Sequence, residues 1–224
     1  MVHSAAAVID LPGGRFEDYL GALPAHRRTV ARRELRRFRE AGLTMSTGRL
    51  SESMSFLPGL VAKVAARHGG PVDPERLRPV LLAQAAYLDE VSVVAVASGE
   101  ATGPVACSLS YVHRDTLHVR MVGLDYEAAR TGDAYFVTTY YETIRQAYRL
   151  GLGAVDFGVA PYRPKVLRGA RLMPLYGVLR DRSRASGPAV RGADVRAWAS
   201  GLLGADLGTS APPSSWWEKL DDLG

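Results

Sequence analysis

The chain has 224 residues, 47% hydrophobic and 23% charged, with a formal net charge of +5. These are globular proportions, and they exclude a wholly disordered chain. The single cysteine, Cys107, excludes an internal disulfide and a thiolate metal cage, and its apolar neighbours predict a buried thiol. No apolar run approaches the roughly 20 residues that span a bilayer, so we expect a cytoplasmic protein without a membrane partner.

The first part of the chain is predicted to be mainly helical. Residues 1–14 are expected to form an N-terminal lead-in. Pro24 and Gly42 fit the start and end of an arginine-rich helix, and Asp73 fits the N-cap of a later one. Helices are expected over residues 15–23, 25–41, 56–68 and 74–87, with a short strand over 43–47.

The second part predicts a sheet with one long helix. Short turns between the first three strands favour antiparallel pairing. Alternation in the third strand places Leu117, Val119 and Met121 on one face and His118, Arg120 and Val122 on the other. Strands are expected over 91–97, 104–112, 116–123, 154–157 and 172–179, a helix over 134–150, and a turn or short helix over 165–169.

The order of these elements predicts an α/β (α+β) fold with a mixed, mostly antiparallel sheet flanked by helices. We expect one domain over residues 15–180 and a C-terminal tail with a short helix over 181–224.

Two segments carry more specific motifs. The first runs from Tyr19-Leu20 through the arginine-rich helix to Glu40-Ala41-Gly42. The second runs from Tyr135-Phe136 and Tyr140-Tyr141 through Asp156-Phe157-Gly158 to Lys165, Arg168-Gly169-Ala170 and Pro174. Together and in this order, they resemble the Fem-type and peptidoglycan-biosynthesis-like branch of the acetyltransferase-like (GNAT) superfamily.

The resemblance implies an N-acyltransferase that acts on an amine of a small molecule, with a donor cleft between splayed central strands. The donor implied is acyl-CoA or, as in Fem-type proteins, an aminoacyl-tRNA. Residues 130–134 match only a fragment of the usual pyrophosphate-binding loop, so both donors stay open. Such relatives carry a further N-terminal half, which a homodimer or a partner protein could supply. The alternative is a non-catalytic binding or partner protein with the same fold.

Acyl transfer needs a base for the amine and groups that hold the donor. The candidate catalytic residues are His118, Glu90 and Tyr141. His118 could take the amine proton if its strand face borders the cleft. By resemblance, Lys165 contacts a phosphate of the donor or substrate, and Arg168 adds a forked donor. The candidate residues for substrate or donor binding are Arg120, Asp156, Tyr162, Lys165 and Arg168.

The arginine-rich helix has two interpretations. It is either a solvated charged face or a surface that binds RNA phosphates through residues such as Arg28, Arg32 and Arg36. No clustered set of His, Cys and Asp residues suggests a metal, so we expect no metal cofactor.

Overall fold

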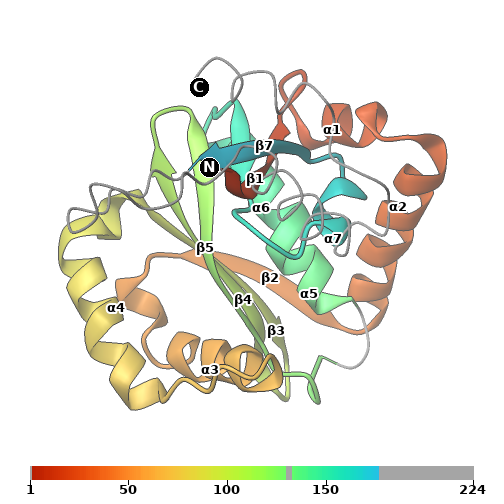
Figure 1. Ribbon diagram of the computed structural model, residues 1–224. Coiled ribbons are helices and arrows are strands. Elements are labelled where there is room, and N and C mark those ends of the chain that lie inside the picture. Colours follow the sequence, from red (N-terminus) through yellow and green to blue (C-terminus); the bar gives the residue numbers. More distant parts are fainter. Residues whose placement is uncertain (1, 130–132, 177–224) are drawn as a thin grey trace, which may run out of the picture. The chain divides into compact units, whose positions relative to one another are not determined.

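The computed structural model describes residues 2–129 and 133–176 (Figure 1). The chain divides into two compact units, which are described separately. The large unit comprises residues 10–156, and the small unit combines the first nine residues with those from 157 onward. The expected C-terminal tail and the end of the last predicted strand lie outside the described residues.

The large unit contains the predicted helices and strands with bounds that agree to within two residues. Asp73 caps α4 as expected, because its side chain accepts a hydrogen bond from the Glu75 backbone N–H at 2.9 Å. The helices are α1 (Phe16–Ala22), α2 (Ala25–Glu40), η1 (Ser51–Ser53), α3 (Leu57–Arg67), α4 (Pro74–Leu88), η2 (Asp89–Val91), α5 (Ala134–Phe136), the π-helical η3 (Val137–Glu142) and α6 (Thr143–Arg149). The strands are β2 (Leu43–Gly48), β3 (Ser92–Gly99), β4 (Gly103–His113), β5 (Thr116–Leu124) and β6 (Ala154–Asp156).

The sheet of the large unit has the order β2-β3-β4-β5-β6. The first four strands are antiparallel to their neighbours, and β6 is parallel to β5. Helices α3 and α4 cover one face, where Leu60 and Leu81 pack against Val94 and Leu109. Figure 1 shows α5 and α6 on the other side of these strands. The mixed, mostly antiparallel sheet flanked by helices is therefore confirmed.

A β-bulge in β5 changes the predicted faces of this strand. Val119 lies opposite Ser110 and Met121 opposite Leu109, so Arg120 is the extra residue. Because directly opposed residues share a face, Met121 projects toward the α3 and α4 side, where it packs on the core. The strict alternation expected for residues 117–122 is therefore wrong beyond Val119.

The parallel pairing of β5 and β6 is short. Its register runs from Thr116 opposite Ala154 to His118 opposite Asp156, whereas β5 itself continues to Leu124. Cys107 lies on β4 opposite Gly123 of β5, and burial raises the pKa of its thiol to about 12. The thiol is thus buried, as its apolar neighbours predicted, and it is protonated at neutral pH.

The small unit contains a strand where a lead-in was expected. β1 (Val2–Asp10) pairs antiparallel with β7 (Arg171–Tyr176), and the Ala7 backbone bonds residues 157 and 158 on its other side. Ser4 to Ile9 are buried accordingly. An apolar run with neighbours on both sides is a central strand, which corrects the expectation for residues 1–14. The predicted turn or helix at 165–169 is α7 (Arg163–Val166).

Candidate active site

A histidine and an aspartate meet where β5 and β6 stop pairing. His118 Nδ1 lies 3.3 Å from Asp156 Oδ2, and the two side chains are 42% and 23% exposed. The strand register produces this contact, because His118 and Asp156 are paired positions on neighbouring strands. A partly exposed imidazole beside a carboxylate is suited to accept and return a proton.

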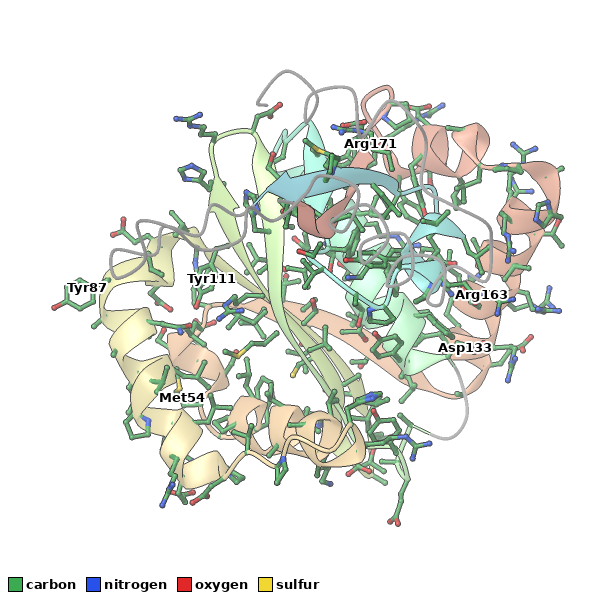
Figure 2. All side chains as sticks on the ribbon, in the orientation of Figure 1. Met54, Tyr87, Tyr111, Asp133, Arg163 and Arg171 are labelled. Atoms are coloured by element: carbon green, nitrogen blue, oxygen red, sulfur yellow. The ribbon has the colours of Figure 1, made fainter. Side chains whose placement is uncertain are left out.

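His118 lies on the face of the sheet that α3 and α4 cover, beside a polar pair from β4 and α4. Tyr111 of β4 lies directly opposite His118, and its hydroxyl bonds Gln84 of α4 at 2.8 Å. Figure 2 shows Tyr111 on the α4 side of the strands. Burial raises the pKa of Tyr111, the charge of Arg120 opposes this shift, and that of Asp89 adds to it. Arg120, a predicted binding residue, is therefore near this group.

Glu90 lies on η2 with an exposed side chain. Its backbone carbonyl accepts a hydrogen bond from Arg49 at 2.7 Å. The neighbouring Asp89 binds the backbone N–H of Ser51 at 2.8 Å and its hydroxyl at 2.7 Å, and these bonds lower the pKa of Asp89. This segment therefore ties the start of β3 to η1. A catalytic role for Glu90 stays a prediction.

Tyr141 is as deeply buried as its neighbour Tyr140, with 1% of each exposed. Its hydroxyl donates a hydrogen bond to the buried carboxylate of Glu34 on α2, and its ring meets Phe16 edge to face. These contacts join η3 to α1 and α2. The hydroxyl is thus engaged within the core, and a catalytic role would require it to leave Glu34.

Three predicted binding residues belong to the small unit and are all buried. The Lys165 ammonium donates to four backbone carbonyls, of Phe157, Gly158, Val159 and Ala160, at 2.5–3.4 Å. The Tyr162 hydroxyl accepts the Ala5 backbone N–H at 3.0 Å, and Arg168 donates to Pro164 at 3.0 Å. These bonds organise the loop after residue 157, so a phosphate contact by Lys165 would require it to leave those carbonyls.

The arginines predicted to bind RNA occupy α2. Arg28 donates to the Gly21 carbonyl at 2.9 Å, whereas Arg36 forms an exposed ion pair with Glu40 at 3.5 Å. Arg32 is exposed. An i,i+4 ion pair of this kind is weak and leaves a guanidinium accessible to other anions. The helix therefore presents a basic surface, and its binding to RNA stays a prediction.

The sequence contained no strong signal for Tyr111 and Gln84. Tyr111 lies near the end of a largely apolar strand and Gln84 interrupts an amphipathic helix, and each fits a half-buried position. Their pairing depends on how α4 packs on β4. Among the described residues, no group of three or more His, Cys, Asp or Glu side chains could hold a metal ion. Across the same residues, every helix is too short or too polar to cross a membrane.

Solved structures share this fold. The similar chains include FemX, with a TM-score of 0.60 and 10% identity, and the C-terminal domain of a putative lysylphosphatidylglycerol synthetase from Agrobacterium fabrum, with 0.52 and 15%. A conserved protein of unknown function from Bacteroides thetaiotaomicron gives 0.54 and 13%. The matches cover 77%, 76% and 76% of this chain, but only 60%, 58% and 57% of theirs, respectively. At these identities the likeness concerns the fold alone.

Comparison of sequences gives the family directly. No protein of curated function matches the chain. A family model described as "Acetyltransferase (GNAT) domain" matches residues 25–166, which is more than half of the chain. This span includes β2 to β6 with the His118–Asp156 pair, and it confirms the superfamily that the sequence motifs indicated. The chain therefore belongs to the acetyltransferase (GNAT) family.

Proposed function

We propose that the chain is an N-acyltransferase that moves an activated acyl group onto the amine of a small molecule, with His118 as the general base. The observation that carries this proposal is the contact of His118 with Asp156 at the point where β5 and β6 stop pairing. In this family, the divergence of two central parallel strands is where the resemblance implies a donor cleft.

The contact suggests how the histidine would work. A carboxylate accepts hydrogen bonds, so Asp156 favours the tautomer with the proton on Nδ1 of His118. That tautomer leaves a lone pair on Nε2, which can take a proton from an attacking amine. Asp156 is then a positioning residue, which also stabilises the imidazolium that forms.

The proposed reaction is direct transfer. The amine nitrogen attacks the acyl carbonyl carbon, a C–N bond forms, and the C–S bond of a thioester or the C–O bond of an aminoacyl ester breaks. His118 receives the amine proton and returns it to the leaving sulfur or oxygen. Alternate backbone N–H groups of β5 beyond His118 point toward the β6 edge, where they could polarise the carbonyl.

The donor is an acyl-CoA or an aminoacyl-tRNA. The basic surface of α2 supports the tRNA alternative, because Arg32 and its exposed neighbours could contact phosphates. Transfer should be measured with a panel of acyl-CoA thioesters and with mixed aminoacyl-tRNAs, using labelled donors and a panel of small amines. Transfer that ends on ribonuclease treatment identifies the tRNA donor.

We expect His118→Ala to reduce the transfer rate about 10²- to 10⁴-fold, the usual contribution of a general base. His113→Ala is the matched control. This exposed histidine lies on the same hairpin, with its ring 6.2 Å from that of His118. It should retain activity within about two-fold, because it has no role in this mechanism. Equal rates for His118→Ala and the parent protein would refute the base assignment.

The alternative is a non-catalytic binding protein with the GNAT fold. Equilibrium dialysis with the same labelled donors separates the two proposals. Binding of a donor without transfer to any amine of the panel would favour the non-catalytic protein. Donor binding together with transfer supports the enzyme.

A further inference from the structure

A pocket lies on the opposite face of the sheet from His118. Its volume is about 480 Å³, within the range of about 300–1,000 Å³ typical of small-molecule sites. Met45 and Thr47 of β2 line it, and the strand register places them opposite Ala97 and Ala95, on the face that η3 and α6 cover. The candidate active site instead borders α3 and α4. The pocket is therefore a separate site within the large unit.

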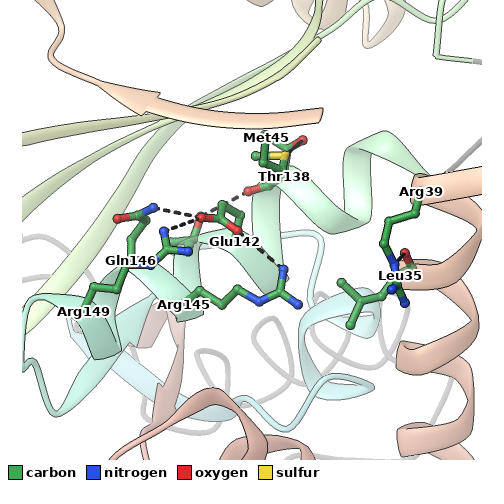
Figure 3. A network of polar contacts seen from close by, with 9 residues as sticks. Leu35, Arg39, Met45, Thr138, Glu142, Arg145, Gln146 and Arg149 are labelled. Atoms are coloured by element: carbon green, nitrogen blue, oxygen red, sulfur yellow. Dashed lines mark hydrogen bonds and ion pairs between the residues drawn. The ribbon is translucent and has the colours of Figure 1, made fainter. Parts of the chain in front are cut away.

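The walls of the pocket are basic. Arg39 of α2 and Arg145 and Arg149 of α6 line it, together with the carboxylate of Glu142 at the end of η3 (Figure 3). The carboxylate is buried, and it accepts Arg149 at 2.8 Å and Gln146 at 2.8 Å, with Arg145 at 3.5 Å. Three arginines and one glutamate leave a net charge of +2 around the cavity.

The three arginines that line the pocket have N–H donors available to a ligand. A guanidinium has five N–H donors, and the Arg149 side chain is 60% exposed despite its bond to Glu142. Arg39 is exposed and bonds only weakly to its own helix, through Nε to the Leu35 carbonyl at 3.3 Å. Arg145 is held over the ring of Phe16, at 4.3 Å from its centroid. Such partly anchored guanidinium groups suit the recognition of phosphate oxygens.

Most of the other lining residues are apolar, whereas Ser46 and Thr47 of β2 are polar. Leu35 and Phe38 of α2, Leu43 and Met45 of β2, and Val137 of η3 line the cavity. A ligand that fills it would therefore combine a compact anionic head with an apolar body. A phosphate monoester carries a charge of about −1.5 to −2 at neutral pH, which matches the net charge of the walls.

We propose that this pocket binds a small organic phosphate. Arg39, Arg145 and Arg149 would bind its phosphate group, and its apolar part would pack against the leucine, phenylalanine and methionine side chains that line the pocket. The proposal is independent of the acyl transfer proposed for the other face, because it involves none of the residues of that site.

Isothermal titration of the full chain tests the proposal with four probes. Phenyl phosphate has both the head and the body, inorganic phosphate has only the head, benzyl alcohol has only the body, and benzoate has a single charge. We expect phenyl phosphate to bind about ten-fold more tightly than each of the others. Absence of phenyl phosphate binding, or equal or tighter binding of any other probe, would overturn the proposal.

Substitutions locate the binding. Arg39→Gln removes one exposed lining charge and should weaken phenyl phosphate binding about ten-fold or more, the usual effect of losing a charge-assisted hydrogen bond. Arg33→Gln is the matched control, since Arg33 is exposed on the same helix but does not line the cavity. It should change the affinity less than two-fold, because salt screens the effect of a surface charge that lies away from the site. Equal losses in both variants would show a general electrostatic effect and reject the pocket.

A third variant fills the cavity without altering its charge. Thr47→Trp introduces a large side chain at an exposed lining position of β2, and it should abolish phenyl phosphate binding while circular dichroism stays that of the parent. Binding unchanged in a folded Thr47→Trp protein would place the phosphate elsewhere and contradict the proposal.

Discussion

At the scale of single residues, polar groups divide into buried ones that build the fold and exposed ones that are available for chemistry. Lys165 and Tyr141 are engaged with internal partners, the first with backbone carbonyls and the second with Glu34. His118 and Arg120 are partly or fully exposed beside a group of polar side chains. A buried charged group is costly unless it is satisfied, so its internal bonds take precedence over ligand binding.

The contact of Tyr141 with Glu34 leads to a stability prediction. Tyr141→Phe removes the hydroxyl but keeps the ring, so the buried carboxylate loses a donor. We expect the free energy of unfolding, measured by urea denaturation, to fall by about 1–3 kcal/mol. Tyr126→Phe is the control, because that ring is only partly buried and its contact with Arg67 uses the ring face. A loss in the control as large as that in Tyr141→Phe would contradict this account.

At the scale of elements, the packing of α3 on β5 depends on a glycine. A Cβ at Gly123 would lie 2.6 Å from the Leu60 Cβ and 2.7 Å from the Cys107 Sγ. The helix can therefore approach the strand only where no side chain intervenes. The polar group near His118 lies on this same side of the sheet, which α3 and α4 both cover.

Two glycine substitutions with opposite expected signs test this packing. Gly123→Ala should lower the free energy of unfolding by about 1–3 kcal/mol, because the added methyl overpacks the contact with α3. Gly59→Ala, within α3, meets no atom within 4 Å, and it should raise that free energy by about 0.5–1 kcal/mol through helix propensity. Thermal and urea unfolding measure both. Stabilisation by Gly123→Ala would show that the helix lies further from the strand.

At the scale of the whole molecule, the small unit joins the two ends of the described chain. β1 begins at Val2 and pairs with β7, which ends at Tyr176, and Ala5 bonds the hydroxyl of Tyr162. Contacts of such long sequence separation form only after much of the chain has been ordered. The loop that follows residue 157 therefore depends on the first nine residues for its order.

Removal of residues 2–9 should expose this dependence. Without β1, β7 loses its partner and Tyr162 its backbone donor, so amide hydrogen exchange over residues 157–170 should accelerate at least about ten-fold. Amides of α3 in the large unit provide the internal control and should stay protected. Uniform acceleration throughout both units would contradict this division, and so would unchanged exchange over 157–170.

The sequence by itself determined the local elements of the large unit and the family. The helix termini at Pro24, Gly42 and Asp73 and the positions of strands β3 to β5 depend on the chemistry of nearby residues, which a linear pattern records. The superfamily was indicated by the sequence motifs, and the family model that matches residues 25–166 supports it independently. His118 and Asp156 were both candidate site residues, but for separate roles.

Tertiary structure decided the rest, because those features depend on which distant segments meet. β1 appeared as a lead-in since its partners lie beyond residue 156, and the bulge at Arg120 is a property of the pairing of β5 with β4. The partners of Tyr141 and Lys165, the pairing of His118 with Asp156, and the basic pocket around Glu142 are likewise set by packing. The sequence specifies the chemical type of each side chain, whereas its burial and its partners depend on how the strands and helices pack around it.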